Sequence, residues 1–216
     1  MLDSRTAPFS LRERKTYQKM IFKKSFLLVG ALGFFISKAG IIKGLTPFGI
    51  SFLTASMGTS FSLVSFLSVL FGTISSNGLN KYNYIIAAGL IYSVNIIFNK
   101  NRKISVFKSS IISSLIFIVV SFIDLILFRE IFIYDIIMII FEGVVVFTLS
   151  YIFSYSIPKI EQNYNLKYTN EEIICTFITI SLAISGLGDL GFSSISLKNI
   201  LSIITVITFG YNFGAP

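Results

Sequence analysis

Long apolar runs constrain this chain more than any other feature of its sequence. Runs of about 17 to 25 residues recur from Ser25 to Phe213, and each is long enough to cross the roughly 30 Å apolar core of a bilayer as a helix. Charged residues make up only 13% of the chain, about half the share in soluble domains. Strands of a membrane barrel would instead alternate polar and apolar residues over about ten positions. We therefore predict an all-α fold, a polytopic bundle of transmembrane helices.

The apolar runs predict about eight spans. Their approximate bounds are 25–42, 46–58, 60–76, 82–98, 106–128, 132–154, 170–187 and 197–213. The second run is short for a crossing, so it either crosses fully or is re-entrant. Pro47 can start this helix, and Gly58 to Ser60 can turn the chain back into the next one. We expect residues 46–76 to form a hairpin of two helices rather than one long helix.

Basic residues give the orientation of the bundle. Residues 1–24 form a basic tail, and residues 25–216 form the transmembrane domain. With eight crossings, thirteen of the eighteen basic residues lie on one side: Arg5, Arg12, Arg14, Lys15, Lys19, Lys23, Lys24, Lys100, Arg102, Lys103, Lys108, Lys159 and Lys167. Because cytoplasmic loops carry the excess of Lys and Arg, that side is predicted to be the cytoplasm. Both chain ends then lie there.

The residue inventory excludes several familiar kinds of site. The chain has no histidine and a single cysteine, Cys175, so it can form neither a zinc site of His and Cys nor an internal disulfide. Nucleophiles activated by histidine are excluded for the same reason. The segment GLGDLG, residues 186–191, matches a dinucleotide-binding pattern but follows a predicted span instead of a strand, so we interpret it as a turn. We predict no catalytic, cofactor-binding or metal-binding residue and no nucleic-acid partner.

Two groups of acidic residues are the candidate structural or interaction sites. Thr169 and Glu172 have capping-box spacing, and Glu171 also suits the first turn of a helix, so these residues are predicted to start the seventh span. Glu142 lies near the centre of the sixth span, with Asp135 nearer its start and the outer interface. A carboxylate at mid-bilayer costs about 2.5 to 3.5 kcal/mol on insertion scales, so Glu142 is expected to be protonated or paired.

Two interpretations of Glu142 remain open from the sequence. It could be a functional polar contact, to Lys38 or to serines of a neighbouring span. It could equally be a protonated side chain whose only role is a hydrogen bond between helices.

Three blocks of sequence resemble one known family. They are "GIIKGLTPFGISFLTASM", "YDIIMIIFEGVVVFTLSYIFSYSIP" and "EEIICTFITISLAISGL", in this order. The chain resembles the membrane-embedded N-terminal region of stage II sporulation protein E, the septal serine phosphatase of endospore-forming bacteria. The resemblance covers the chain from about Phe22 to Gly214.

That resemblance implies what would follow in a full-length protein. It implies further membrane spans, a cytoplasmic region that contacts the tubulin-like division protein, and a phosphatase domain that acts on an anti-anti-sigma factor to release the forespore sigma factor. Manganese or magnesium is implied only for that domain, which no part of this sequence matches. We expect the chain to be a fragment, a truncated reading frame or a stand-alone membrane module.

Two functions from different classes are compatible with these observations. The first is a membrane anchor that places a phosphatase at the polar septum without catalysis of its own; its expected partners are the bilayer, further copies of itself and septal proteins. The second is a small-molecule transporter or its substrate-binding subunit, built around Glu142, Lys38 and the short span after Pro47. A cavity lined by Glu142 and Lys38 would favour transport, whereas a closely packed bundle would favour the anchor.

Overall fold

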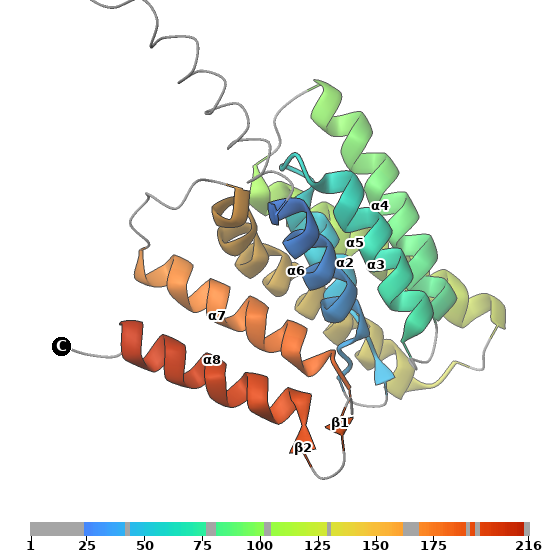
Figure 1. Ribbon diagram of the computed structural model, residues 1–216. Coiled ribbons are helices and arrows are strands. Elements are labelled where there is room, and N and C mark those ends of the chain that lie inside the picture. The colour runs from blue at the N-terminus through green and yellow to red at the C-terminus, as the bar shows by residue number, and fades with distance from the viewer. Residues whose placement is uncertain are drawn as a thin grey trace, which may run out of the picture.

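The computed structural model describes residues 24–41, 44–76, 81–101, 105–128, 131–161, 169–188, 191–192 and 195–213. Residues 24–38 form a helix, drawn in blue in Figure 1. The helices that follow are α2 (Phe48–Ser56), α3 (Ser62–Ser75), α4 (Lys81–Asn101), α5 (Val106–Phe128), α6 (Ile133–Glu161), α7 (Asn170–Ser185) and α8 (Leu197–Phe213). One antiparallel pair of two-residue strands, β1 (Gly191–Phe192) and β2 (Ile195–Ser196), precedes α8. The predicted all-α fold is confirmed apart from this short pair.

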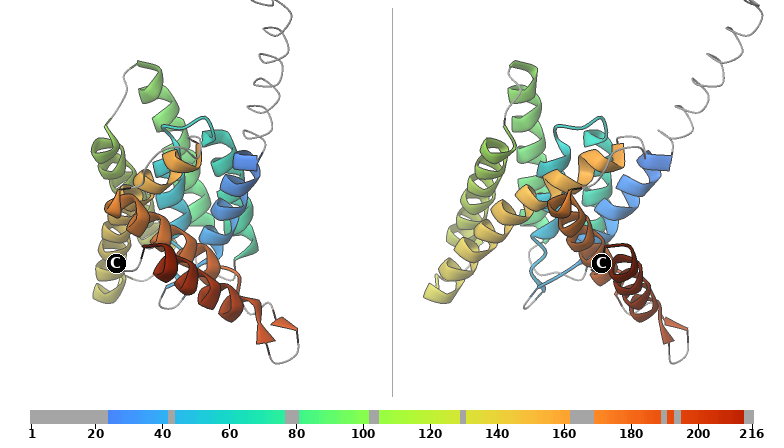
Figure 2. Two further views of the ribbon diagram at one scale, coloured as in Figure 1. Left: turned by 60° about the vertical axis from the view of Figure 1, so that its left-hand side comes forward. Right: turned by 90° about the vertical axis from the view of Figure 1, so that its left-hand side faces the viewer.

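Successive helices run in opposite directions (Figures 1 and 2). In Figure 1 the helix 24–38, α3 and α5 run downward, while α2, α4 and α6 run upward. The α7 and α8 helices form an antiparallel pair at the lower left of the same view. Connections between neighbours therefore alternate between the two ends of the bundle.

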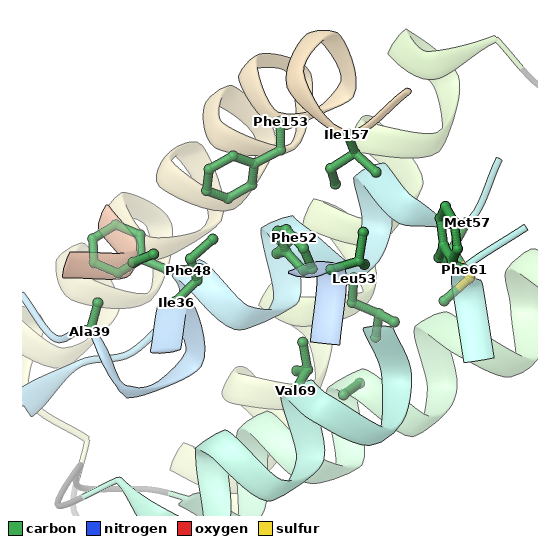
Figure 3. Packing of buried hydrophobic residues seen from close by; sticks show 13 residues of the cluster. Ile36, Ala39, Phe48, Phe52, Leu53, Met57, Phe61, Val69, Phe153 and Ile157 are labelled. Atoms are coloured by element: carbon green, nitrogen blue, oxygen red, sulfur yellow. The ribbon is translucent and has the colours of Figure 1, made fainter. Parts of the chain in front are cut away.

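Helix α2 lies at the centre of the bundle although it has only nine residues. It contacts α3, α4, α5 and α6, and eight of its nine residues are buried. Figure 3 shows Phe52 and Leu53 of α2 between Val69 of α3 on one side and Phe153 and Ile157 of α6 on the other. The rings of Phe52 and Phe153 meet edge to face with centroids 5.8 Å apart, a favourable geometry for aromatic pairs.

The helix 24–38 approaches its neighbours closely because glycines face it. A methyl group added at Gly72 of α3 would lie 2.5 Å from the backbone oxygen of Phe34, and one added at Gly49 of α2 would lie 2.6 Å from Ser37 Oγ. At Gly186, which follows α7, a methyl group would overlap with the backbone oxygen of Phe35. Small residues at such contacts let helix backbones pack directly on one another.

The α5 and α6 helices form the most extensive helix pair and carry the clearest membrane signal. By length and composition, Val106–Phe128 and Ile133–Pro158 could each cross a bilayer. Ser62–Ser75 and Leu197–Tyr211 are apolar but shorter than a full span. Within the described residues two helices are both long enough and apolar enough to cross a bilayer, so the predicted number of about eight spans is not confirmed. In α4 the polar residues Asn83 and Asn95 lower the apolar character of the helix.

The helix bounds agree with the sequence prediction more closely than the span count does. Residues 46–76 form two helices, α2 and α3, as predicted, with a break around Gly58. Helix 24–38 ends earlier than the predicted residue 42, because the chain turns through Gly44 at φ +78° and closes the turn with a 2.8 Å bond from Ile41 N to Leu45 O. Helix α6 continues past the predicted residue 154 to Glu161 and contains Pro158. The predicted basic tail lies outside the described residues except for Lys24.

Candidate functional site

Glu142 of α6 is 5% exposed and takes part in a hydrogen-bond chain that joins three parts of the fold. The hydroxyl of Tyr84, in the first turn of α4, donates to Glu142 Oε1. The backbone N–H of Thr46, in the connection that precedes α2, donates to Tyr84 Oη over 3.1 Å. Tyr84 is 2% exposed, and its ring stacks on Phe117 of α5 with centroids 5.7 Å apart. Three segments distant in the sequence thus meet at one buried hydroxyl, and a fourth, α5, packs on the ring that carries it.

The direction of each bond in this chain follows from the groups involved. A backbone N–H can only donate, so the oxygen of Tyr84 must accept from Thr46. The hydroxyl hydrogen of Tyr84 is then free to point at Glu142, whose Oε1 is the acceptor. Glu142 therefore acts here as an acceptor, which a glutamine carbonyl could also provide.

The structure separates Glu142 from the partner suggested by the sequence. Lys38 lies over the ring of Phe34, with Nζ 5.5 Å from the ring centroid, and Glu142 bonds Tyr84 instead. A serine contact occurs one residue further along α6, where Ser114 of α5 donates to the backbone oxygen of Gly143 over 2.7 Å. Glu142 thus makes a hydrogen bond between helices, while its role and its protonation state stay predictions.

Most other buried hydroxyls bond within their own helices. Ser51, Thr54, Thr73 and Ser150 donate to the carbonyl four residues earlier, which satisfies the hydroxyl without linking helices. An exception joins α6 to α7, where the hydroxyls of Ser156 and Thr179 lie 2.8 Å apart. The hydroxyls of Ser65, Ser110 and Ser113 are buried and have no hydrogen-bond partner among the described residues.

The predicted capping box at the start of α7 is present. The amide of Glu172 donates to Thr169 Oγ1 over 3.3 Å, and the amide of Thr169 donates to Glu172 Oε2 over 3.0 Å. Glu171 lies exposed in the same turn, where an acidic side chain interacts favourably with the helix dipole. Thr169 and Glu172 therefore cap the N-terminal end of α7.

Asp135 and Pro47 lie at helix starts. Asp135 is half-buried in the first turn of α6. Pro47 immediately precedes α2, as predicted, and no side chain caps that helix.

Within the described part of the chain, acidic residues and Cys175 form no group of three that could hold a metal ion. The GLGDLG segment begins as the turn that ends α7, with Gly186 as its C-cap and Gly188 at φ +66°.

The candidate site is therefore the buried hydrogen-bond chain of Thr46, Tyr84 and Glu142. Tyr84 and Thr46 were not identified from the sequence. The sequence offered one signal for Tyr84: its polar hydroxyl stands at the start of an otherwise apolar run, where it would need a hydrogen-bond partner.

Comparison with known proteins gives two matches. The model of the family described as "SpoIIE, N-terminal domain" matches residues 3–216. The chain is also similar to stage II sporulation protein E of Bacillus subtilis (strain 168), with 27% identity over 212 residues. That alignment covers 91% of this chain but 24% of the relative, so the chain spans about a quarter of the relative's length. No solved structure matches.

Proposed function

Because the chain belongs to the family of SpoIIE N-terminal domains, we propose that it is the membrane anchor and localisation module of a sporulation serine phosphatase. In this proposal the phosphatase activity resides in a separate domain, as the family resemblance implies. The anchor brings that domain to the polar septum, where release of the forespore sigma factor would follow.

The observation that carries the proposal is the distribution of side chains around α5. Its buried face combines four serines with Phe117, Val120 and Leu125, while its exposed face holds large apolar side chains. The serines are Ser110, Ser113, Ser114 and Ser121, and the most exposed apolar residues along the middle of the helix are Leu115, Val119 and Ile123. Full burial of a side chain of this size is worth about 1.5 to 3 kcal/mol in water, and these half-exposed side chains lose part of it. In hydrocarbon the same arrangement carries no such cost, which supports a lipid-facing surface.

Helix direction and charge together support a multi-pass arrangement. The alternating directions of successive helices agree with eight crossings. The short α2 and the following α3 then form a helical hairpin, and each counts as one crossing. The distribution of Lys and Arg then favours cytoplasmic chain ends. This topology, association with further copies of the chain and contacts with septal proteins are parts of the proposal.

Close packing supports the anchor over the transporter. The cavity required for transport would be lined by Glu142 and Lys38, yet Glu142 bonds Tyr84 and Lys38 lies over Phe34. Glycines at positions 72 and 186 bring neighbouring backbones into contact with the helix 24–38. We therefore propose a bundle whose polar contacts serve packing.

A fusion experiment tests the anchor. Residues 1–216 joined to a fluorescent protein, expressed in a sporulating bacterium, should remain in the membrane fraction after alkaline carbonate washing and should gather at the polar septum. A matched fusion with Val119→Arg and Ile123→Arg places two charges on the exposed face of α5 and should insert poorly. Complete extraction of the parent fusion by carbonate would contradict the proposal.

A second assay tests the absence of catalysis. The 216-residue chain, purified in detergent with manganese, should not release phosphate from a phosphorylated anti-anti-sigma factor. The proposal of an anchor without catalysis would be overturned by metal-dependent phosphate release that is abolished by a point change within residues 1–216.

A further inference from the structure

Helix α2 is attached to the rest of the bundle by few directional interactions. The hydroxyls of Ser51, Thr54 and Ser56 all donate to carbonyls at positions 47, 50 and 53, within α2 or directly before it. In the described stretch 44–56, the recorded hydrogen bonds to another helix come from Thr46, whose backbone N–H and side chain both bond the hydroxyl of Tyr84. Apolar packing surrounds α2, but the hydrophobic effect is non-directional, so Thr46 supplies the directional link that sets the position of its entry.

The Tyr84 hydroxyl is well placed to fix that position. Stacking on Phe117 and nearly complete burial hold the ring, so the hydroxyl cannot turn toward water. Glu142 accepts its hydrogen and leaves its oxygen open to the Thr46 amide. If either side chain loses this bond, a buried donor or acceptor is left without a partner, which costs more than the bond itself contributes.

We propose that the chain Thr46–Tyr84–Glu142 is a latch that holds the entry of α2 against α4 and α6. Tyr84 and Glu142 are its positioning residues. Loss of the latch raises the rate at which α2 opens from its packed position. The latch rests on contacts within the chain and does not depend on the anchor function.

Accessibility of a cysteine in α2 tests the latch. Ser51 is 0% exposed, so Ser51→Cys, combined with Cys175→Ser, places a thiol that reacts with a maleimide only when α2 opens. In the full 216-residue chain in detergent, Tyr84→Phe and Glu142→Leu should raise the labelling rate about fivefold to thirtyfold, which corresponds to about 1 to 2 kcal/mol. Glu142→Gln should stay within about twofold of the parent, because its carbonyl accepts the same bond.

Two controls separate a latch from general destabilisation. Tyr92 belongs to the same helix and stacks on Phe66 with centroids 4.2 Å apart, and no hydrogen bond of its hydroxyl is recorded in the described structure. Tyr92→Phe should therefore leave the labelling of position 51 unchanged. A second reporter, Ser156→Cys between α6 and α7, should not respond to Tyr84→Phe.

Three outcomes would overturn the latch. They are equal labelling in the Tyr84→Phe and Tyr92→Phe proteins, an equal rise at both reporter positions, and a Glu142→Gln protein that behaves like Tyr84→Phe. If Glu142→Leu does not fold, the comparison of the two tyrosine variants decides the question.

Discussion

At the residue scale, glycines determine how closely the helix 24–38 packs. Gly72 and Gly186 face backbone oxygens of Phe34 and Phe35, and backbone atoms cannot move aside as a flexible side chain could. Gly89 of α4 differs from both, since a methyl group added there would meet nothing within 4 Å. The three glycines therefore form a natural comparison of packed and unpacked positions.

We predict opposite effects of alanine at these positions. Gly72→Ala and Gly186→Ala should each lower the free energy of unfolding by about 1 to 3 kcal/mol, because overpacking forces backbones apart. Gly89→Ala should be neutral or raise it by up to about 1 kcal/mol, because alanine favours the helix. Thermal unfolding of the three variants in one detergent measures the difference. Equal melting temperatures for Gly72→Ala and Gly89→Ala would contradict this account of the packing.

At the element scale, the start of α7 depends on the Thr169 capping box. Thr169→Ala removes the acceptor for the amide of Glu172, and substitutions of this kind cost about 1 kcal/mol. We expect faster amide hydrogen exchange at residues 171–173, with the remainder of α7 little changed. Thr148→Ala in α6 is the matched control, because the Thr148 hydroxyl donates to a carbonyl that is already part of the helix. Unchanged exchange at residue 172 would show that the box does not hold this helix end.

The elements were predictable because apolar runs and helix ends leave local signals. Thr169 and Glu172 give a capping box in four letters, and Pro47 indicates the start of α2. The extension of α6 was not predictable in this way, since a proline normally ends or kinks a helix. Ile157 is fully buried beside it, and this tertiary packing favours continued helix across Pro158.

The partners of Glu142 in the hydrogen-bond chain could not be predicted from local sequence patterns. Glu142 could be singled out from the sequence because a carboxyl group inside an apolar run is costly. Its partner Tyr84 is 58 residues away in the chain, and no periodic pattern connects the two positions. Thr46 contributes its backbone amide, which every residue except proline carries, and its side chain, and nothing in the local sequence links either group to Tyr84.

At the scale of the whole molecule, the alternating helices make the topology testable. In a Cys175→Ser background, a cysteine at position 102 should be protected from an impermeant maleimide added to intact cells and should react after permeabilisation. A cysteine at position 81 should react from outside, because Lys81 begins α4 at the opposite end of the bundle from the predicted cytoplasmic loop. Outside labelling at position 102 would exclude the proposed orientation.

The contact between Gly186 and Phe35 also has a consequence for biosynthesis. The two residues lie about 150 positions apart, so at a synthesis rate of about 5 to 20 residues per second the helix 24–38 waits roughly 8 to 30 s for this partner. During that time the backbone surface around Phe35 faces lipid, the insertion machinery or another nascent segment. The helix 24–38 therefore completes its packing only after α7 has been synthesised, and a ribosome that stalls before α7 would leave this surface uncovered.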